Sequence, residues 1–276
     1  MTALFNRLVE AARIAWVSFK LYTVSDIIRG KSGIISLAGI SLWLILIILP
    51  VSLFANPQIG LGRVAAFIFG GILVFNVYSV ATWDWAWEIR KLINYNVLEH
   101  LIASGKSPLM VYLGLIPVSL IWLLMIIVLG YGVVNVFVAQ PEIVISDLKL
   151  LILAFTLLII VVLSYALVLA STILISGTSG AIVEIFSWVL PLATGGFIPL
   201  SLMPESLRTL ALLTPFSYPA ELLRKALNIY EPILPTNTMF IIGYIYGLAF
   251  LTFSITLFKL GIRKTLKEGL KTLSAW

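Results

Sequence analysis

The sequence contains no cysteine and only one histidine in 276 residues. Without cysteine the chain cannot form disulfides, iron–sulfur clusters or thiolate zinc sites, and His100 cannot build a histidine-based metal site alone. Charged residues are also scarce, at 11% of the chain compared with about 25% in soluble domains, while 61% of residues are hydrophobic. This balance predicts a polytopic membrane protein that binds no metal or cofactor through its own residues, and it argues against nucleic acid as a partner.

Six apolar segments each approach the roughly 20 residues that a helix needs to cross the hydrocarbon of a membrane. They are residues 33–55, 64–82, 109–138, 148–176, 181–203 and 238–260. The sequence therefore predicts an all-α protein in which residues 33–276 form a single domain of six transmembrane helices.

Residues 1–32 are expected to form an amphipathic helix that precedes this domain. Its apolar side consists of Phe5, Leu8, Val9, Ala12, Trp16 and Phe19, and its polar side carries Arg7, Glu10, Arg13 and Lys20. This pattern suits the interface between lipid and water. Packing of the same helix against a partner protein is compatible with that position.

Positive charge divides unequally between the two sides of the predicted bundle. Thirteen lysines and arginines lie in the N-terminal segment, the 83–108 connection and the C-terminal tail, whereas five lie on the opposite side. Because positively charged connections are retained in the cytoplasm, both termini and the 83–108 connection are expected to be cytoplasmic in a cell-membrane protein.

Residues 97–104 have the start and stop signals of a short helix in this cytoplasmic connection. Asn96 is predicted to cap its N-terminus in a capping box with Glu99, and Gly105 is suited to the left-handed position after its C-terminus. Leu98, Leu101 and Ile102 share one side of this helix, while Glu99, His100 and Ser104 lie mostly elsewhere. The pattern predicts docking on another protein, and the alternative is a surface helix packed on its own bundle.

The connection after the fifth predicted span is long and lies on the outer side. Two short amphipathic helices begin at Pro204 and Pro219, and Pro215 and Tyr218 belong to the turn that joins them. These helices are too short to cross the membrane and too apolar for a free loop. They are expected to re-enter the outer leaflet against protein, with Leu207, Leu210 and Leu213 shielded from water.

Three motifs that suggest catalysis or polar transport chemistry are incomplete. Two Gly-Lys-Ser triplets, at 30–32 and 105–107, lack the upstream glycine of a phosphate-binding loop. The Gly-Thr-Ser-Gly run at 177–180 has the form used by rhomboid-type intramembrane proteases, but no histidine base follows it. Glu184 is the clearest intramembrane carboxylate; it either faces a cavity or partner, or lies at the cytoplasmic interface.

The whole layout resembles the ABC-2 type permease family, which supplies the transmembrane subunits of ABC exporters. The residues 1–32 resemble the connecting helix of that family, and Glu88 to Pro108 resembles its coupling helix. The family signature near the fifth span is similar to the segment from Pro191 to Arg224, with Gly195-Gly-Phe-Ile-Pro199, Met203-Pro204 and Thr214-Pro215-Phe-Ser-Tyr218.

The resemblance implies a carrier without catalytic residues of its own. Two permease copies, identical or different, would form the pathway, and two separate ATP-binding subunits would carry ATP and Mg. The residues implied in coupling to the ATPase are Val97, Leu98, Glu99, His100, Leu101, Ile102, Ser104 and Gly105. The residues implied in the outer gate are Gly195, Gly196, Pro199, Pro204, Pro215 and Tyr218.

A secondary carrier or channel that works without ATP is the alternative from a different functional class. The absence of an evident internal repeat and of a charged relay argues against this alternative. The sequence does not identify the transported molecule, so a drug, a lipid, a peptide and a glycan are all compatible with it.

Overall fold

The computed structural model describes residues 2–28, 35, 38–46, 60–105, 108–176, 185, 189–190, 194–195 and 199–268. All regular structure within these residues is helical. Four of the described helices are long and apolar enough to cross a membrane: Leu61–Asn94, Gly114–Phe137, Leu148–Ile175 and Thr236–Glu268. These helices indicate a multi-pass membrane protein. The other two predicted spans, 33–55 and 181–203, fall mostly outside the described residues.

The two longest uninterrupted apolar runs form helices almost at the predicted boundaries. Helix α6 covers Leu109–Phe137 and helix α7 covers Leu148–Ser176. Pro108 precedes α6, at a position where the missing backbone N–H of proline costs nothing. At the start of α7, the Asp147 carboxylate accepts a hydrogen bond from the backbone N–H of Leu150 at 3.0 Å. Local signals therefore suffice to place both helices.

The second predicted span is longer than expected. Helix α3 (Leu61–Ser79) continues through the π-helix η3 (Val80–Ala86) into α4 (Trp87–Asn94), so the predicted end at residue 82 is wrong. Glu88 is tolerated in this helix because it is buried with two partners, Tyr22 and Lys91. Trp85 is buried and donates its indole N–H to the Ser119 hydroxyl at 3.0 Å.

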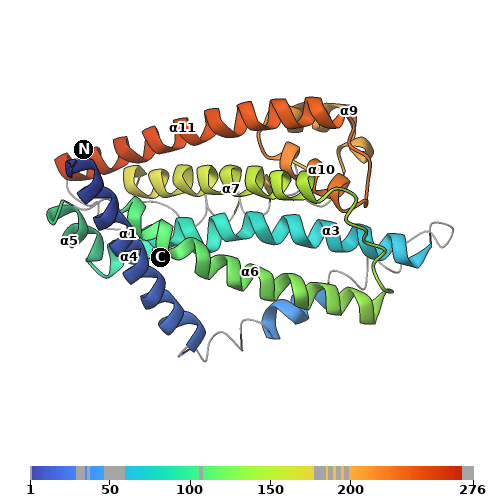
Figure 1. Ribbon diagram of the computed structural model, residues 1–276, viewed down its shortest axis with the longest axis horizontal. Coiled ribbons are helices and arrows are strands. Elements are labelled where there is room, and N and C mark those ends of the chain that lie inside the picture. The colour runs from blue at the N-terminus through green and yellow to red at the C-terminus, as the bar shows by residue number, and fades with distance from the viewer. Residues whose placement is uncertain are drawn as a thin grey trace.

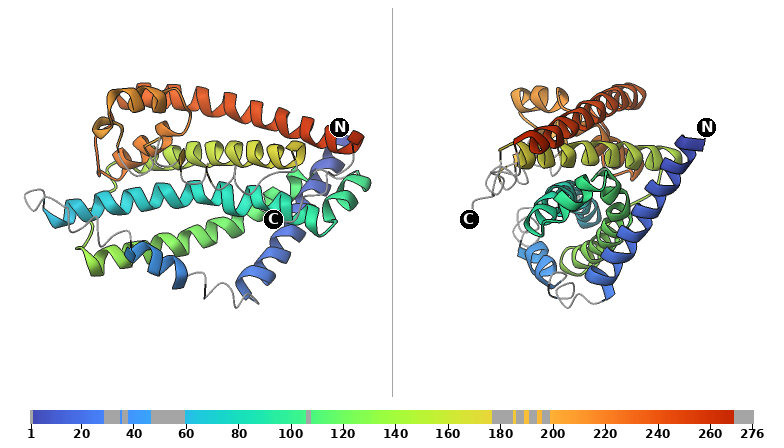
Figure 2. Two further views of the ribbon diagram at one scale, coloured as in Figure 1. Left: turned by 180° about the vertical axis from the view of Figure 1, so that it is seen from behind. Right: turned by 90° about the vertical axis from the view of Figure 1, so that its left-hand side faces the viewer.

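Different elements gather at the two ends of the bundle (Figure 1). One end holds α1 (Thr2–Tyr22), η1 (Thr23–Ile28), α4, α5 (Val97–Ala103) and the last turns of α11 (Thr236–Glu268). The other end holds η4 (Leu200–Leu202), α9 (Glu205–Leu212) and α10 (Ser217–Ala226). Helix α1 runs obliquely across its end, as an interfacial helix would (Figure 2).

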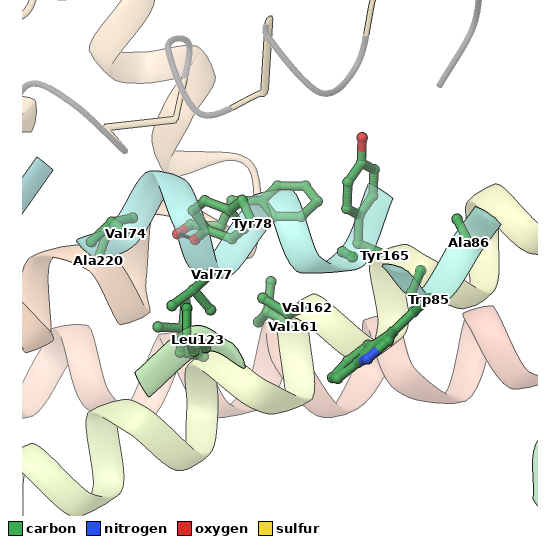
Figure 3. Packing of buried hydrophobic residues seen from close by; sticks show 14 of the residues in the cluster. Val74, Val77, Tyr78, Trp85, Ala86, Leu123, Val161, Val162, Tyr165 and Ala220 are labelled. Atoms are coloured by element: carbon green, nitrogen blue, oxygen red, sulfur yellow. Dashed lines mark hydrogen bonds between the residues drawn. The ribbon is translucent and has the colours of Figure 1, made fainter. Parts of the chain in front are cut away.

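The long helices pack closely where glycines remove side chains. At Gly243 and Gly247 of α11, an added Cβ would lie 2.8 Å from a methyl carbon of Leu157 in α7. Small residues let membrane helices approach each other in this way. Side chains of α3, α6, α7 and α10 meet in the core, including Val77, Leu123, Val161 and Ala220 (Figure 3).

Candidate functional site

The turn between α4 and α5 uses Asn96 differently from the capping-box prediction. Asn96 has a left-handed backbone, with φ 57°, and its side chain caps no backbone group of α5. Its N–H bonds the carbonyl of Ile93 at 2.9 Å, so Asn96 terminates α4 in the position that glycine or asparagine usually occupies. The capping-box prediction is therefore wrong. Gly105, with φ 72°, occupies the predicted left-handed position after α5.

The apolar side of α5 faces its own bundle. Leu98 is fully buried, and Leu101 and Ile102 are half-buried against the core. The expectation that these three side chains form an exposed docking patch is wrong for Leu98, because it already fills a place in the core. The exposed residues of the predicted coupling segment are Val97, Glu99, His100, Ser104 and Gly105.

A groove of about 550 Å³ lies where α1 passes α4, α5 and the start of α6. Arg13, Val17 and Leu21 of α1 line one side, and Val97 and Leu101 of α5 line the other. Val97 thus belongs both to the predicted coupling segment and to the wall of an open groove. The two amphipathic segments singled out by the sequence meet at this groove.

Two contacts fix α1 against the bundle beside this groove. At Gly114 of α6, an added Cβ would overlap the carbonyl oxygen of Ala15 and lie 2.8 Å from the backbone nitrogen of Phe19. At the end of α1, the Tyr22 hydroxyl donates a hydrogen bond to the buried carboxylate of Glu88 in α4. Lys91 lies 3.5 Å from the second oxygen of the same carboxylate. Helix α1 is therefore bonded to the continuous α3–α4 rod.

At the opposite end, the turn before α10 inserts an aromatic side chain into the bundle. The Phe216 ring makes edge-to-face contacts with Tyr78, Tyr165 and Phe250, at centroid distances of 5.8, 5.4 and 5.6 Å. The Tyr78 hydroxyl also donates a hydrogen bond to the carbonyl of Phe216. One residue of a short connection thus joins α3, α7 and α11.

Helix α10 carries a buried ion pair. Arg224 and Glu221 are each 2% exposed, and the guanidinium lies 3.2 Å from the carboxylate. The backbone N–H of Leu200 donates to the same carboxylate oxygen at 3.2 Å. Burial raises the pKa of the Glu221 carboxyl and lowers the pKa of the Arg224 guanidinium, and the opposite charge of each partner counteracts both shifts. The pair links α10 to η4.

The predicted outer-gate residues have different environments. Gly195, Pro199 and Tyr218 are buried, Pro215 is half-buried and Pro204 is exposed. Gly196 and Glu184, like the Gly-Thr-Ser-Gly run, lie outside the described residues. Within this chain, Leu207 and Leu210 of α9 and Leu213 directly after it are 45%, 61% and 67% exposed, so the expected re-entry of this helix against protein stays a prediction. Only α10 is buried in the bundle.

Sequence reasoning did not identify the contact between Tyr22 and Glu88. No local pattern relates residues 66 positions apart. For the pair Glu221–Arg224 the sequence did contain a signal. Two opposite charges three residues apart lie on the same face of a helix and can form an ion pair. Within the part of the chain that the structure describes, no group of three or more histidine, cysteine, aspartate or glutamate side chains could hold a metal ion.

Neither a protein-family model nor a curated protein matches this chain. The resemblance to ABC-2 type permeases therefore depends on the motifs and on the placement of the amphipathic segments.

Proposed function

We propose that the chain is the membrane-spanning carrier subunit of an ATP-driven exporter whose ATPase is a separate polypeptide. The observation that carries this proposal is the groove between α1 and α5, at the end of the bundle that charge counting assigns to the cytoplasm. A partner surface that enters the groove would contact apolar side chains, Val17, Leu21 and Val97, next to the charged groups Glu10 and Arg13.

The connections of this groove to the spans support a role in transmitting movement. Helix α5 follows α4 after two residues, and α4 continues η3 and α3 without a break in the helix. Tyr22 and Gly114 hold α1 against α4 and α6. Displacement of α1 and α5 together would therefore move the inner ends of at least two spans. Rigid helices that pack in two alternative arrangements can carry such coupling.

For ATP to drive transport, the ATP-bound ATPase must bind one carrier conformation more tightly than the other. If ATP binding closes the ATPase against the carrier, it favours the carrier conformation that matches the closed form. Two carrier copies would then alternate together between inward and outward access. The buried α10, joined to η4 through Glu221 and to the spans through Phe216, would move as part of the outer end.

Complex formation with an ABC ATP-binding subunit tests the proposal, and a gene for such a subunit beside this one would supply the ATPase to use. The wild-type chain should co-purify with that ATPase in fixed proportion and should stimulate ATP hydrolysis in lipid vesicles. Val97→Asp places a carboxylate in the groove and should reduce both, because an unpaired charge is costly to desolvate. Ala103→Asp, on the exposed side of the same helix and outside the groove, is the matched control.

Two results would contradict the proposal. One is a chain that transports its substrate in vesicles without any ATPase, driven by an ion gradient, as a secondary carrier would. The other is equal loss of the complex in Val97→Asp and Ala103→Asp at normal membrane abundance, since docking would then not depend on the groove.

A further inference from the structure

Helix α11 lies at the edge of the bundle and exposes one side along its length (Figures 1 and 2). Only 17% of its most apolar stretch is buried within the chain. In its first half, the exposed side carries Ile241, Ile245 and Leu248, which are 58%, 60% and 51% exposed. Their spacing of four and three residues places them on one face of the helix. This face suits the hydrocarbon of a membrane.

The same face of α11 becomes basic over its last turns. Lys259, Arg263 and Lys267 follow one another at intervals of four residues, and all three are exposed. Lys259 comes eighteen residues after Ile241, and Arg263 comes eighteen residues after Ile245. Eighteen residues make about five full turns of an α-helix, so these cations lie on the continuation of the apolar face. We call Lys259, Arg263 and Lys267 the basic stripe.

The cations of the basic stripe are available to a ligand. Among the residues that the structure describes, none forms an ion pair with any of the three. The only acidic residue of α11 is Glu268, which lies 3.9 Å from Lys264. Lys264 directly follows Arg263 and therefore points about 100° away from it around the helix axis. The one carboxylate nearby thus neutralises a lysine outside the stripe.

The length of α11 carries the stripe beyond the hydrocarbon of a membrane. The helix has 33 residues and is therefore about 50 Å long, whereas the hydrocarbon is about 30 Å thick. The stripe lies at the end of the bundle that also holds α1, which has the pattern of an interfacial helix. Long basic side chains there lie along apolar surface and extend their charges to the headgroups. Membrane orientation depends on the number of such charges and not on their sharing one face.

We infer that the basic stripe binds the phosphate groups of anionic phospholipids, whose acyl chains lie against the apolar part of the same face. Leu260 and Leu266 flank the stripe and are 51% and 62% exposed, so apolar contact continues beside the cations. Each lysine or arginine near an anionic membrane surface adds to the attraction. An acidic protein partner would match the charges but not the apolar face that leads to them. The inference does not depend on the exporter proposal.

The test compares an anionic with a zwitterionic lipid next to the stripe. Leu260→Cys and Ile241→Cys, each labelled with bimane, are placed in vesicles that contain brominated phosphatidylglycerol or brominated phosphatidylcholine. Near residue 260, phosphatidylglycerol should reach equal quenching at a mole fraction at least about fivefold lower. Near residue 241, at the other end of the helix, the two lipids should quench equally. Equal quenching at residue 260 as well would overturn the inference and leave an acidic protein as the partner of the stripe.

Two salt conditions distinguish a lipid headgroup from free phosphate. High sodium chloride should weaken the preference for phosphatidylglycerol, because salt screens exposed charges. Sodium phosphate at the same ionic strength should weaken it no further, since inorganic phosphate lacks the acyl chains. A loss in phosphate that does not occur in chloride would show a site for soluble phosphate and would overturn the lipid assignment. This comparison requires no further variant.

Matched variants locate the lipid site on the stripe. Arg263→Gln should reduce the preference severalfold, whereas Lys264→Gln, one residue away and off the stripe, should leave it unchanged. Arg263→Lys keeps the charge and should retain the preference. Lys259→Gln, Arg263→Gln and Lys267→Gln combined should abolish it, and the exposure of all three side chains leaves the packing of the helix intact. An unchanged preference in the triple variant would overturn the assignment.

Discussion

The Tyr22 hydroxyl donates a hydrogen bond to the Glu88 carboxylate and so holds α1 against α4. A hydrogen bond to a charged group contributes about 1.5–3 kcal/mol. Tyr22→Phe should therefore lower the free energy of unfolding in detergent by about that amount and increase protease cleavage of α1. Tyr95→Phe is the control, because Tyr95 is 76% exposed. Equal stability of the two variants would show that α1 is held by other contacts.

Gly114 allows α1 to cross α6 in backbone contact. A methyl group at this position would overlap the backbone of α1, so Gly114→Ala should destabilise the protein by about 1–3 kcal/mol. Gly132→Ala in the same helix is the matched control, since an added Cβ there meets nothing within 4 Å. Thermal unfolding of the purified chain compares the two. A neutral Gly114→Ala would contradict the close crossing of α1 and α6.

The buried pair Glu221–Arg224 should behave differently in single and double variants. Glu221→Gln or Arg224→Met leaves one buried charge unpaired and should cost about 3–5 kcal/mol, whereas replacing both by apolar residues should cost less than either single change. Glu268→Gln disrupts the exposed pair with Lys264 and should cost at most about 1 kcal/mol. Chemical unfolding provides the double-mutant cycle, and additive losses would be evidence against a coupled pair.

Cysteine labelling tests the predicted orientation without interference, because the chain has no native cysteine. Glu99→Cys and Glu268→Cys, at the end that holds α5 and the last turn of α11, should react with an impermeant maleimide only after permeabilisation of right-side-out vesicles. Glu205→Cys in α9 should react without permeabilisation. Direct labelling of Glu99→Cys from outside would reverse the orientation.

The sequence predicted helix boundaries correctly where the signals are local. Helices α6 and α7 match because each is one apolar run with proline or aspartate at its start. The α3–α4 rod was cut short at residue 82, because Asp84 and Glu88 read as the start of a loop. Glu88 is tolerated in the helix through Tyr22, a partner that no local pattern reveals.

The direction in which an amphipathic helix faces was harder to predict than its existence. Periodicity correctly grouped Leu98 with Leu101, yet it could not show that the chain's own bundle covers this side of α5. The same limit applies to α9, where Leu210 was expected against protein and is 61% exposed. The sequence pattern shows that such side chains avoid water, but it does not show whether the chain's own bundle, another protein or lipid covers them.

Docking of the ATPase at the groove between α1 and α5 is tested most directly by the protection of a cysteine within that groove. Val97→Cys and the control Ala103→Cys are exposed to impermeant maleimide in inside-out vesicles, with and without an added ABC ATP-binding subunit. The ATPase should protect Val97→Cys, the protection should differ between ATP and ADP, and Ala103→Cys should stay reactive throughout. Equal reactivity of Val97→Cys in all conditions would contradict ATPase docking at this groove.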